Sequence, residues 1–232
     1  ILLDLTKEFI NYNLHPMWHK VSPIAFRLPY IVNWKSSWFG DSKTYKDALV
    51  TDIKIRELLK KELTGIAIGD ILISKDQDST IIDVFTAKAS LILGKTGENV
   101  EQIKVKLHNK FGGKYVINVK EVKQPDLNAK IVAFSIANQI EKRMPYKRAI
   151  KQAIAKAMEK GAGGMKVKVG GRLNGAEIAR KETFKEGNIP TQTIRSNIDY
   201  STMRAETVYG TIGLKVWIYK GDIYKKSKKL DS

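Results

Sequence analysis

The stretch "ASLILGKTGENV", residues 89–100, contains the pattern that decides the fold. Four residues separate Ala89 from Gly94-Lys95-Thr96, so the stretch comes within one methyl group of G-x-x-x-x-G-K-[ST], a loop that binds nucleotide phosphates. The quartet Gly94-Lys95-Thr96-Gly97 also fits G-x-x-G, a turn that holds a nucleic-acid backbone. The first motif predicts a nucleotide hydrolase and the second an RNA-binding domain, and the flanking sequence distinguishes between them.

The residues around the loop disfavour the nucleotide hydrolase. A phosphate-binding loop exposes backbone N–H groups and is usually built from glycine and small polar residues, but "SLIL" at 90–93 is apolar. Asp83 is the candidate for a magnesium ligand, and no repeating β-α pattern follows it. A nucleotide-dependent enzyme using Gly94-Lys95-Thr96 is therefore the least favoured alternative.

The elements expected around G-x-x-G favour RNA binding instead. A helix from Asp52 that Gly65 ends is followed by strands at "IAIGDILIS" and "TIIDVFTA". A short helix at "SLIL", a helix over 98–111 and a strand at "KYVINVKEV" complete the series. The helix after the loop directs free N–H groups toward an anion. The apolar stripe of the first helix comprises Ile53, Ile55, Leu58, Leu59 and Leu63, with Lys54, Arg56, Lys60 and Lys61 opposite.

The charge of the chain points to a polyanionic partner. The 232 residues include 41 Lys and Arg against 24 Asp and Glu, a net charge of +17. Such a surplus repels itself unless a partner such as a phosphate backbone neutralises it. No apolar run approaches the roughly 18 residues that span a bilayer, so no membrane partner is expected. The chain has no cysteine, and its histidines are His15, His19 and His108, so neither a metal site nor a cofactor is predicted.

A second α+β unit is expected after Pro125. Asp126 is a suitable N-cap for a helix that Pro145 interrupts, and a second helix runs from Tyr146 to Lys160. A strand at "MKVKV" is followed by a loop containing "KETFKEGNIP" and by strands over 192–209 and 211–219. The expected division is an N-terminal extension (1–16), an irregular basic, Trp-containing arm (17–50), an RNA-binding domain (51–123), an α+β domain (124–222) and a basic tail (223–232).

Four stretches resemble one known family. "SLILGKTGENVEQIKVKL" looks like the KH segment of the bacterial-type ribosomal small-subunit protein three family, and "KVGGRLNGAEIARKETFKEG", "IPTQTIRSNIDY" and "YGTIGLKVWIYKG" resemble its C-terminal half. The resemblance covers residues 17–225 in order. It implies an α+β protein that is not an enzyme: a type II KH domain (αββααβ), then a second α+β domain with two helices packed on a small sheet.

The resemblance also implies a place in the cell. The family binds rRNA in the head of the small ribosomal subunit and lines the channel through which mRNA enters, where it contributes to unwinding structured mRNA. Its partners there are ribosomal small-subunit proteins ten and fourteen, with proteins four and five near the channel. The implied location is the ribosome of a bacterial cytoplasm or of an organelle matrix or stroma. A free-standing KH-type regulator of RNA is the alternative.

Two sets of site residues follow from the resemblance. The family's mRNA-unwinding positions fall on Lys147, Arg148 and Lys151 in "MPYKRAIKQAIAKAM", and the helical spacing puts these three together on an exposed face. Lys142 and Arg143 enlarge the same basic patch, which can grip single strands without a nucleotide site. Arg172 and Asn174 resemble family positions near rRNA, and Arg180, Lys181 and Arg195 are added as candidate contacts to rRNA phosphates.

Three features depart from the family pattern. Residues 1–16 extend beyond its usual start near Met17, and "AFRLP" stands where the family has "GIRLG", so the arm is expected to run differently. Thr96 occupies a position of the clamp where a second basic residue is common. The KH loop therefore either touches RNA or has an architectural role.

Overall fold

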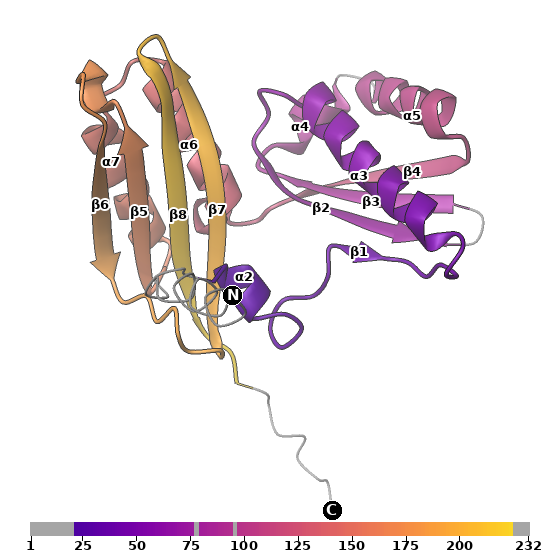
Figure 1. Cartoon of the computed structure of the whole chain (residues 1–232), viewed down its shortest axis with the longest axis horizontal. Coiled ribbons are helices and arrows are strands. Elements are labelled where there is room, and N and C mark those ends of the chain that lie inside the picture. Colours follow the sequence, from indigo (N-terminus) through magenta and orange to yellow (C-terminus); the bar gives the residue numbers. More distant parts are fainter. Residues whose placement is uncertain (1–20, 77–78, 95–96, 225–232) are drawn as a thin grey trace, which may run out of the picture.

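The computed structural model describes residues 21–76, 79–94 and 97–224. Two sheets, each with its own helices, lie side by side in Figure 1. No helix in these described ranges is long and apolar enough to cross a membrane.

The first unit has the element order αββααβ. It consists of α3 (Tyr45–Glu62), β2 (Ile68–Lys75), β3 (Ser79–Thr86), α4 (Ala89–Leu93), α5 (Glu98–Phe111) and β4 (Lys114–Glu121). The strand order is β1-β2-β3-β4, where β1 is the two-residue strand Ser36–Ser37. β2 and β3 are antiparallel, whereas β3 and β4 are parallel because α4 and α5 carry the chain back across one face. This is the predicted type II KH arrangement.

One apolar layer holds this unit together. The alternating strand residues Ile73, Ile82 and Val84 are at most 2% exposed and pack against the helices. Val100, Ile103 and Leu107 recur along α5 at the spacing of one helical face, as predicted, and all three are buried. The opposite face of the sheet carries none of these helices.

The second unit places two helices on a fully antiparallel sheet. Its elements are α6 (Ala129–Glu141), α7 (Tyr146–Glu159), β5 (Gly164–Gly171), β6 (Arg180–Gly187), β7 (Ser196–Thr207) and β8 (Gly210–Asp222), with short 3-10 turns η1 (Pro125–Leu127) and η2 (Leu173–Gly175). The strand order is β6-β5-β8-β7. Figure 1 shows α6 and α7 on one side of this sheet only, which confirms the predicted architecture. Met165, Val167 and Val216 face them, each fully buried.

Three details of the first unit differ from the sequence prediction. The helix predicted from Asp52 begins at Tyr45, and Ile53, placed in its apolar stripe, is 47% exposed. Arg56, placed on the solvent face, instead turns inward. Its guanidinium donates to the carbonyls of Ile71 and Lys35 and pairs with Asp52 at 3.1 Å. An arginine can do this because its fork satisfies several acceptors at once.

Two predictions in the second unit were also wrong. Asn128 caps α6, and its side chain accepts from the N–H groups of Lys130 and Ile131, while the predicted cap Asp126 lies in the preceding 3-10 turn. The segment "KETFKEG", predicted as loop, is most of strand β6 and pairs along its length with β5. Its polar composition suits an edge strand.

The arm predicted as irregular contains short regular elements within residues 21–50. α2 (Pro23–Phe26) packs against β7 of the second unit, and β1 joins the KH sheet in parallel to β2. The predicted N-terminal extension, Trp18 and the predicted tail from 225 onward lie outside the described residues.

Candidate nucleic-acid interface

The G-x-x-G turn forms the corner between α4 and α5. Gly94 and Gly97 both have positive φ angles, +73° and +85°, which L-residues with a side chain rarely adopt. α5 begins at the next residue, Glu98, and Gly97 accepts from the N–H of Val100. Lys95 and Thr96 lie outside the described residues. The two glycines therefore supply the turn geometry that the sequence predicted.

The residues before this turn differ from a phosphate-binding loop. Residues 90–93 belong to helix α4, which places Ile92 in the KH core at 2% exposure, whereas a phosphate-binding loop is an open turn of glycine and small polar residues. Asp83, the candidate magnesium ligand, is bonded to Lys120 at 2.6 Å and to Asn118 at 3.0 Å. The hydrogen bond from Lys120 lowers the pKa of Asp83 below its ordinary value. Both features oppose the nucleotide-hydrolase alternative.

Helix α7 presents the predicted basic face to solvent. Ile150 and Ala157 are fully buried in the core that includes the second sheet, Ala149 is also buried, and Lys147, Arg148 and Lys151 are exposed on the other side. The helix stays on the sheet because its apolar positions recur at helical spacing. The three cations are thus free of the core, as their spacing predicted.

The first turn of α7 carries no negative charge of its own, and Glu182 of β6 accepts from the Tyr146 hydroxyl beside it at 3.0 Å. Pro145 provides no side-chain cap, although the helix N-terminus carries a partial positive charge. Lys147 and Arg148 add two full positive charges at this end. The Nζ atom of Lys147 lies 6.0 Å from the centroid of the Tyr146 ring. Lys142 and Arg143 are exposed in the turn just before it, where Arg143 has a φ of +63°. An anion at this end would relieve the repulsion.

The five candidate rRNA contacts do not form one site. Arg180 lies beside the start of α7, where it donates to the Tyr146 hydroxyl at 3.4 Å and pairs with Glu182 at 3.2 Å. Arg195 pairs with Asp222 at 3.1 Å at the opposite end of the sheet. Arg172 donates to the carbonyls of Ala176 and Tyr209, so it holds the turn that contains Asn174.

Lys181, the fifth candidate, is exposed on edge strand β6, one residue along from Arg180. Neighbouring strand residues point to opposite faces of a sheet. Arg180 therefore joins the basic patch at α7, whereas Lys181 lies on the face of the sheet without helices.

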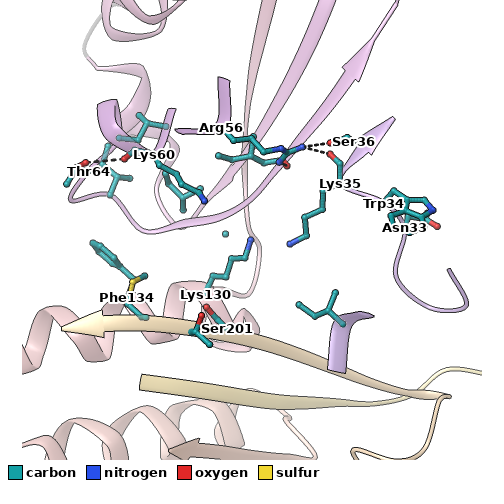
Figure 2. Close-up of a pocket in the computed structure, with 18 of the residues that line it drawn as sticks. Asn33, Trp34, Lys35, Ser36, Arg56, Lys60, Thr64, Lys130, Phe134 and Ser201 are labelled. Atoms are coloured by element: carbon teal, nitrogen blue, oxygen red, sulfur yellow. Dashed lines mark hydrogen bonds between the residues drawn. The ribbon is translucent and has the colours of Figure 1, made fainter. Parts of the chain in front are cut away.

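The cleft between the two units holds charged residues that the sequence did not reveal as a group. It has a volume of about 1020 Å³ and is lined by residues of the arm, α3, β2, α6 and β7. Figure 2 shows Lys35 and Lys130 reaching into it from opposite sides. Both ammonium groups bond to the same oxygen of Asp70, at 2.5 and 2.6 Å.

Asp70 remains a carboxylate because of these two cations. Burial alone would raise its pKa, but the charges of Lys130 and Lys35 outweigh burial and hold the pKa of Asp70 below its ordinary value. The three residues are 35 and 60 positions apart along the chain, so no local pattern could have joined them.

Arg27 is a second residue whose role the sequence did not show. It is fully buried, and its guanidinium donates to the carbonyls of Ser196, Pro23, Pro190, Thr191 and Thr193. Burial lowers the pKa of Arg27, although an arginine stays charged at any ordinary pH. This residue attaches the arm, whose sequence "AFRLP" departs from the family pattern, to the loop before β7.

Comparison with known proteins agrees with this architecture. Residues 54–127 match the family model of the KH domain, and residues 136–218 match that of the ribosomal protein S3 C-terminal domain. A protein of Hydrogenovibrio crunogenus is 45% identical over 210 residues, which cover 90% of this chain and 92% of the relative. One of Hahella chejuensis is 43% identical, covering 89% and 91%, and one of Acinetobacter baumannii 42%, covering 92% and 86%.

All three relatives are named small ribosomal subunit protein uS3, and none is named as an enzyme. The prediction that the chain is not an enzyme is confirmed by these names. The resemblance first seen in "SLILGKTGENV" and in the C-terminal motifs extends over nine-tenths of the chain. The chain belongs to the small ribosomal subunit protein uS3 family.

Proposed function

We propose that the chain is a structural protein in the head of the small ribosomal subunit, where it binds rRNA and lines the channel through which mRNA enters. The family relationship supports the ribosomal location and RNA binding. The proposed neighbours are small-subunit proteins ten and fourteen, with proteins four and five at the channel. The proposed site is the ribosome of a bacterial cytoplasm or of an organelle.

The basic face of α7 is the observation that carries the mRNA part of this proposal. Lys147, Arg148 and Lys151 are exposed beside a helix N-terminus that lacks acidic residues, and Lys142, Arg143 and Arg180 lie next to them. Such a surface attracts the backbone of a single strand without reading its sequence. Strand separation needs no nucleotide site here, because movement of the ribosome along mRNA supplies the work.

The KH turn has a separate part in the proposal. Gly94 and Gly97 allow an RNA backbone to approach the N-terminus of α5 closely, and Lys95 adds a cation between them. We propose the turn and the five candidate residues Arg172, Asn174, Arg180, Lys181 and Arg195 as rRNA contacts. Arg172, which also holds its own turn, combines contact with structure.

The first test removes the α7 cations. Lys147→Ala, Arg148→Ala and Lys151→Ala together should leave the free energy of unfolding within about 0.5 kcal/mol, because exposed side chains outside special contacts contribute little. Translation through a stable mRNA hairpin should slow several-fold, while translation of an unstructured message should not. The matched control is Lys156→Ala with Lys160→Ala, at the far end of the same helix.

Equal slowing on both messages, or on neither, would contradict the role of α7 in unwinding. The ribosomal location has its own test, cosedimentation with the small subunit at physiological salt. A chain found mainly outside the subunit would favour the free-standing KH regulator.

A further inference from the structure

The helix-free face of the second sheet carries a regular array of cations. Because paired residues of antiparallel strands share a face, the register of β6, β5, β8 and β7 defines three rows across the sheet. The first row is Lys185, Lys166, Trp217 and Tyr200; the second is Thr183, Lys168, Lys215 and Thr202; the third is Lys181, Gly170, Gly213 and Arg204. We call these twelve positions the sheet face.

The sheet face is strongly positive. Six of its twelve positions are Lys or Arg and none is Asp or Glu, and the next row on the same side of the sheet pairs Glu206 with Thr211. Lys168 and Lys215 stand directly opposite each other on paired strands, an arrangement that destabilises a sheet unless an anion lies between the charges. The repulsion between these two lysines therefore lowers the stability of the folded sheet, and an anion bound between them would remove it.

The third row forms the floor of a hollow. Gly170 and Gly213 are paired, and their lack of side chains leaves a space of about 740 Å³ bordered by Lys168, Lys181, Lys215 and Arg204. A Cβ built on Gly213 would come no closer than 3.8 Å to its nearest neighbour, the carbonyl oxygen of Gly170. The hollow thus has room for a bulky anionic group that can reach cations on all four strands.

The aromatic end of the face does not offer a free stacking surface. The Trp217 ring lies against Tyr200, with centroids 5.1 Å apart, and the Nζ atom of Lys166 lies 5.4 Å from its centroid. Proteins that bind single strands use aromatic rings on which bases can stack. This face recognises charge and shape, which suits the backbone of double-helical RNA.

A protein partner fits these residues less well. The centre of a protein–protein interface is typically apolar and poor in lysine, whereas the middle row of this face has Lys168 and Lys215 at its centre. The four strands span about 14 Å from first to last axis. That width accommodates a nucleic-acid backbone lying across the strands.

We infer that the sheet face is a second RNA-binding surface, which takes the phosphodiester backbone of a double-helical RNA segment without reading its sequence. It lies on the opposite side of the second sheet from α7 (Figure 1), so this domain holds RNA on both of its faces. The inference rests on the proposed function only in assuming that the chain works within an RNA particle.

The test measures binding of the full chain to a fluorescein-labelled RNA duplex of arbitrary sequence by anisotropy, between about 50 and 200 mM salt. Lys168→Gln with Lys215→Gln should weaken binding about tenfold and reduce the slope of log K against log salt by about 2, one for each lost phosphate contact. The matched control, Lys54→Gln with Lys61→Gln on the exposed side of α3, should change neither by a comparable amount.

A second pair of variants changes the hollow without removing a cation. Gly213→Glu should weaken duplex binding more than Gly213→Gln, because both side chains fill the space but only one brings a negative charge. Thermal unfolding of all variants shows whether they fold. The lysine pair should melt no lower than the unmodified chain, since it removes the repulsion between two opposed charges.

Repeating the measurement in the Lys147→Ala, Arg148→Ala, Lys151→Ala background separates this inference from the role of α7. The same tenfold loss in both backgrounds supports an independent surface. Duplex affinity and slope equal to those of the control would overturn the inference. The inference would also be overturned if the lysine pair variant lost affinity only for single-stranded poly(U), or only for the acidic polypeptide poly-glutamate, and not for the duplex.

Discussion

The two sheets have the same layered construction, but the faces that carry no helices differ in their charged residues. Each packs one face against helices through alternating Ile and Val side chains. On the open face of the KH sheet, Leu72 lies beside Asp83, and Ile81 lies between Ser74 and Val116. One pair of its charges is neutralised within the face, since Lys120 bonds to Asp83. The open face of the second sheet instead carries six cations at the positions of the sheet face, with Glu206 beyond the third row, opposite Thr211.

The buried face of a sheet is constrained by packing, whereas its open face is not. Alternation of side chains fixes which residues are buried, and the fold tolerates little variation there. The residues in between are free to specialise toward a partner. In this chain Asp83 of the KH sheet is paired with Lys120, whereas the cations of the sheet face outnumber the single carboxylate, Glu206, in the row beside them.

The largest effect is expected where the arm closes one end of the second sheet. Arg27→Met removes a buried guanidinium and leaves carbonyls of Ser196, Thr191 and Thr193 without their donor. The free energy of unfolding should fall by about 3 kcal/mol, measured by urea titration. Arg195→Met, whose side chain is 59% exposed, is the control and should change it far less, because an exposed ion pair contributes little.

If Arg27→Met and Arg195→Met proved equally stable, the buried guanidinium of Arg27 would not be what attaches the arm firmly to the second sheet. The KH sheet receives the arm differently, through the two-residue strand β1. A stable Arg27→Met variant would also mean that the loop before β7 finds other donors.

A smaller effect is expected where the KH sheet meets the second unit. Asp70→Asn leaves Lys35 and Lys130 close together without their carboxylate, and the cost should be about 1 kcal/mol, because all three side chains remain about one-third exposed. Asp83→Asn, on the open face of the same sheet, should cost less. A larger cost for Asp83→Asn would reverse this ranking.

The pH dependence of Asp70 has a defined sign. Its pKa is depressed in the folded chain, so its contribution is present above the ordinary carboxylate pKa and is lost as pH falls through the lower, folded value. The stability difference between Asp70→Asn and the unmodified chain should therefore shrink in acid. A difference that grew below about pH 4 would have the wrong sign.

The smallest effect is expected at Asp222, near the end of β8. Hydrogen bonds from Ser196, Tyr219 and Arg195 lower the pKa of Asp222 to about 2. Its contribution is present above the ordinary carboxylate pKa and is lost as pH falls through the folded value. Asp222→Asn should therefore show a shallower loss of stability than the unmodified chain between about pH 4 and 2. Identical acid-unfolding curves would contradict the assignment.

The sequence predicted most of the architecture because its strongest signals are periodic. Val100, Ile103 and Leu107 define α5, and Ala149, Ile150 and Ala157 define the buried side of α7. The exposed position of Lys147, Arg148 and Lys151 followed directly. These are local patterns, and a single helix displays them without help from distant residues.

What the sequence could not show depends on contacts between distant residues or on polar groups turned inward. Arg56 was placed on the solvent face and Arg27 was given no role, because burying a charge is costly unless several acceptors surround it, and those acceptors come from elsewhere in the chain. Strand β6 was missed because an edge strand with Lys and Glu on it has weak hydrophobic alternation. The sheet face appears only once the register of four strands is known.

The buried guanidinium of Arg27 also ties the order of synthesis to the order of folding. Four of its five acceptors lie 163 to 169 residues downstream, so they are made long after the arm itself. In a growing chain that has not yet reached Pro190, the guanidinium of Arg27 lacks four of the carbonyl groups that accept its hydrogen bonds in the folded protein. The arm can therefore settle only when the loop before β7 and the start of β7 have been made, so its docking follows synthesis of most of the second unit.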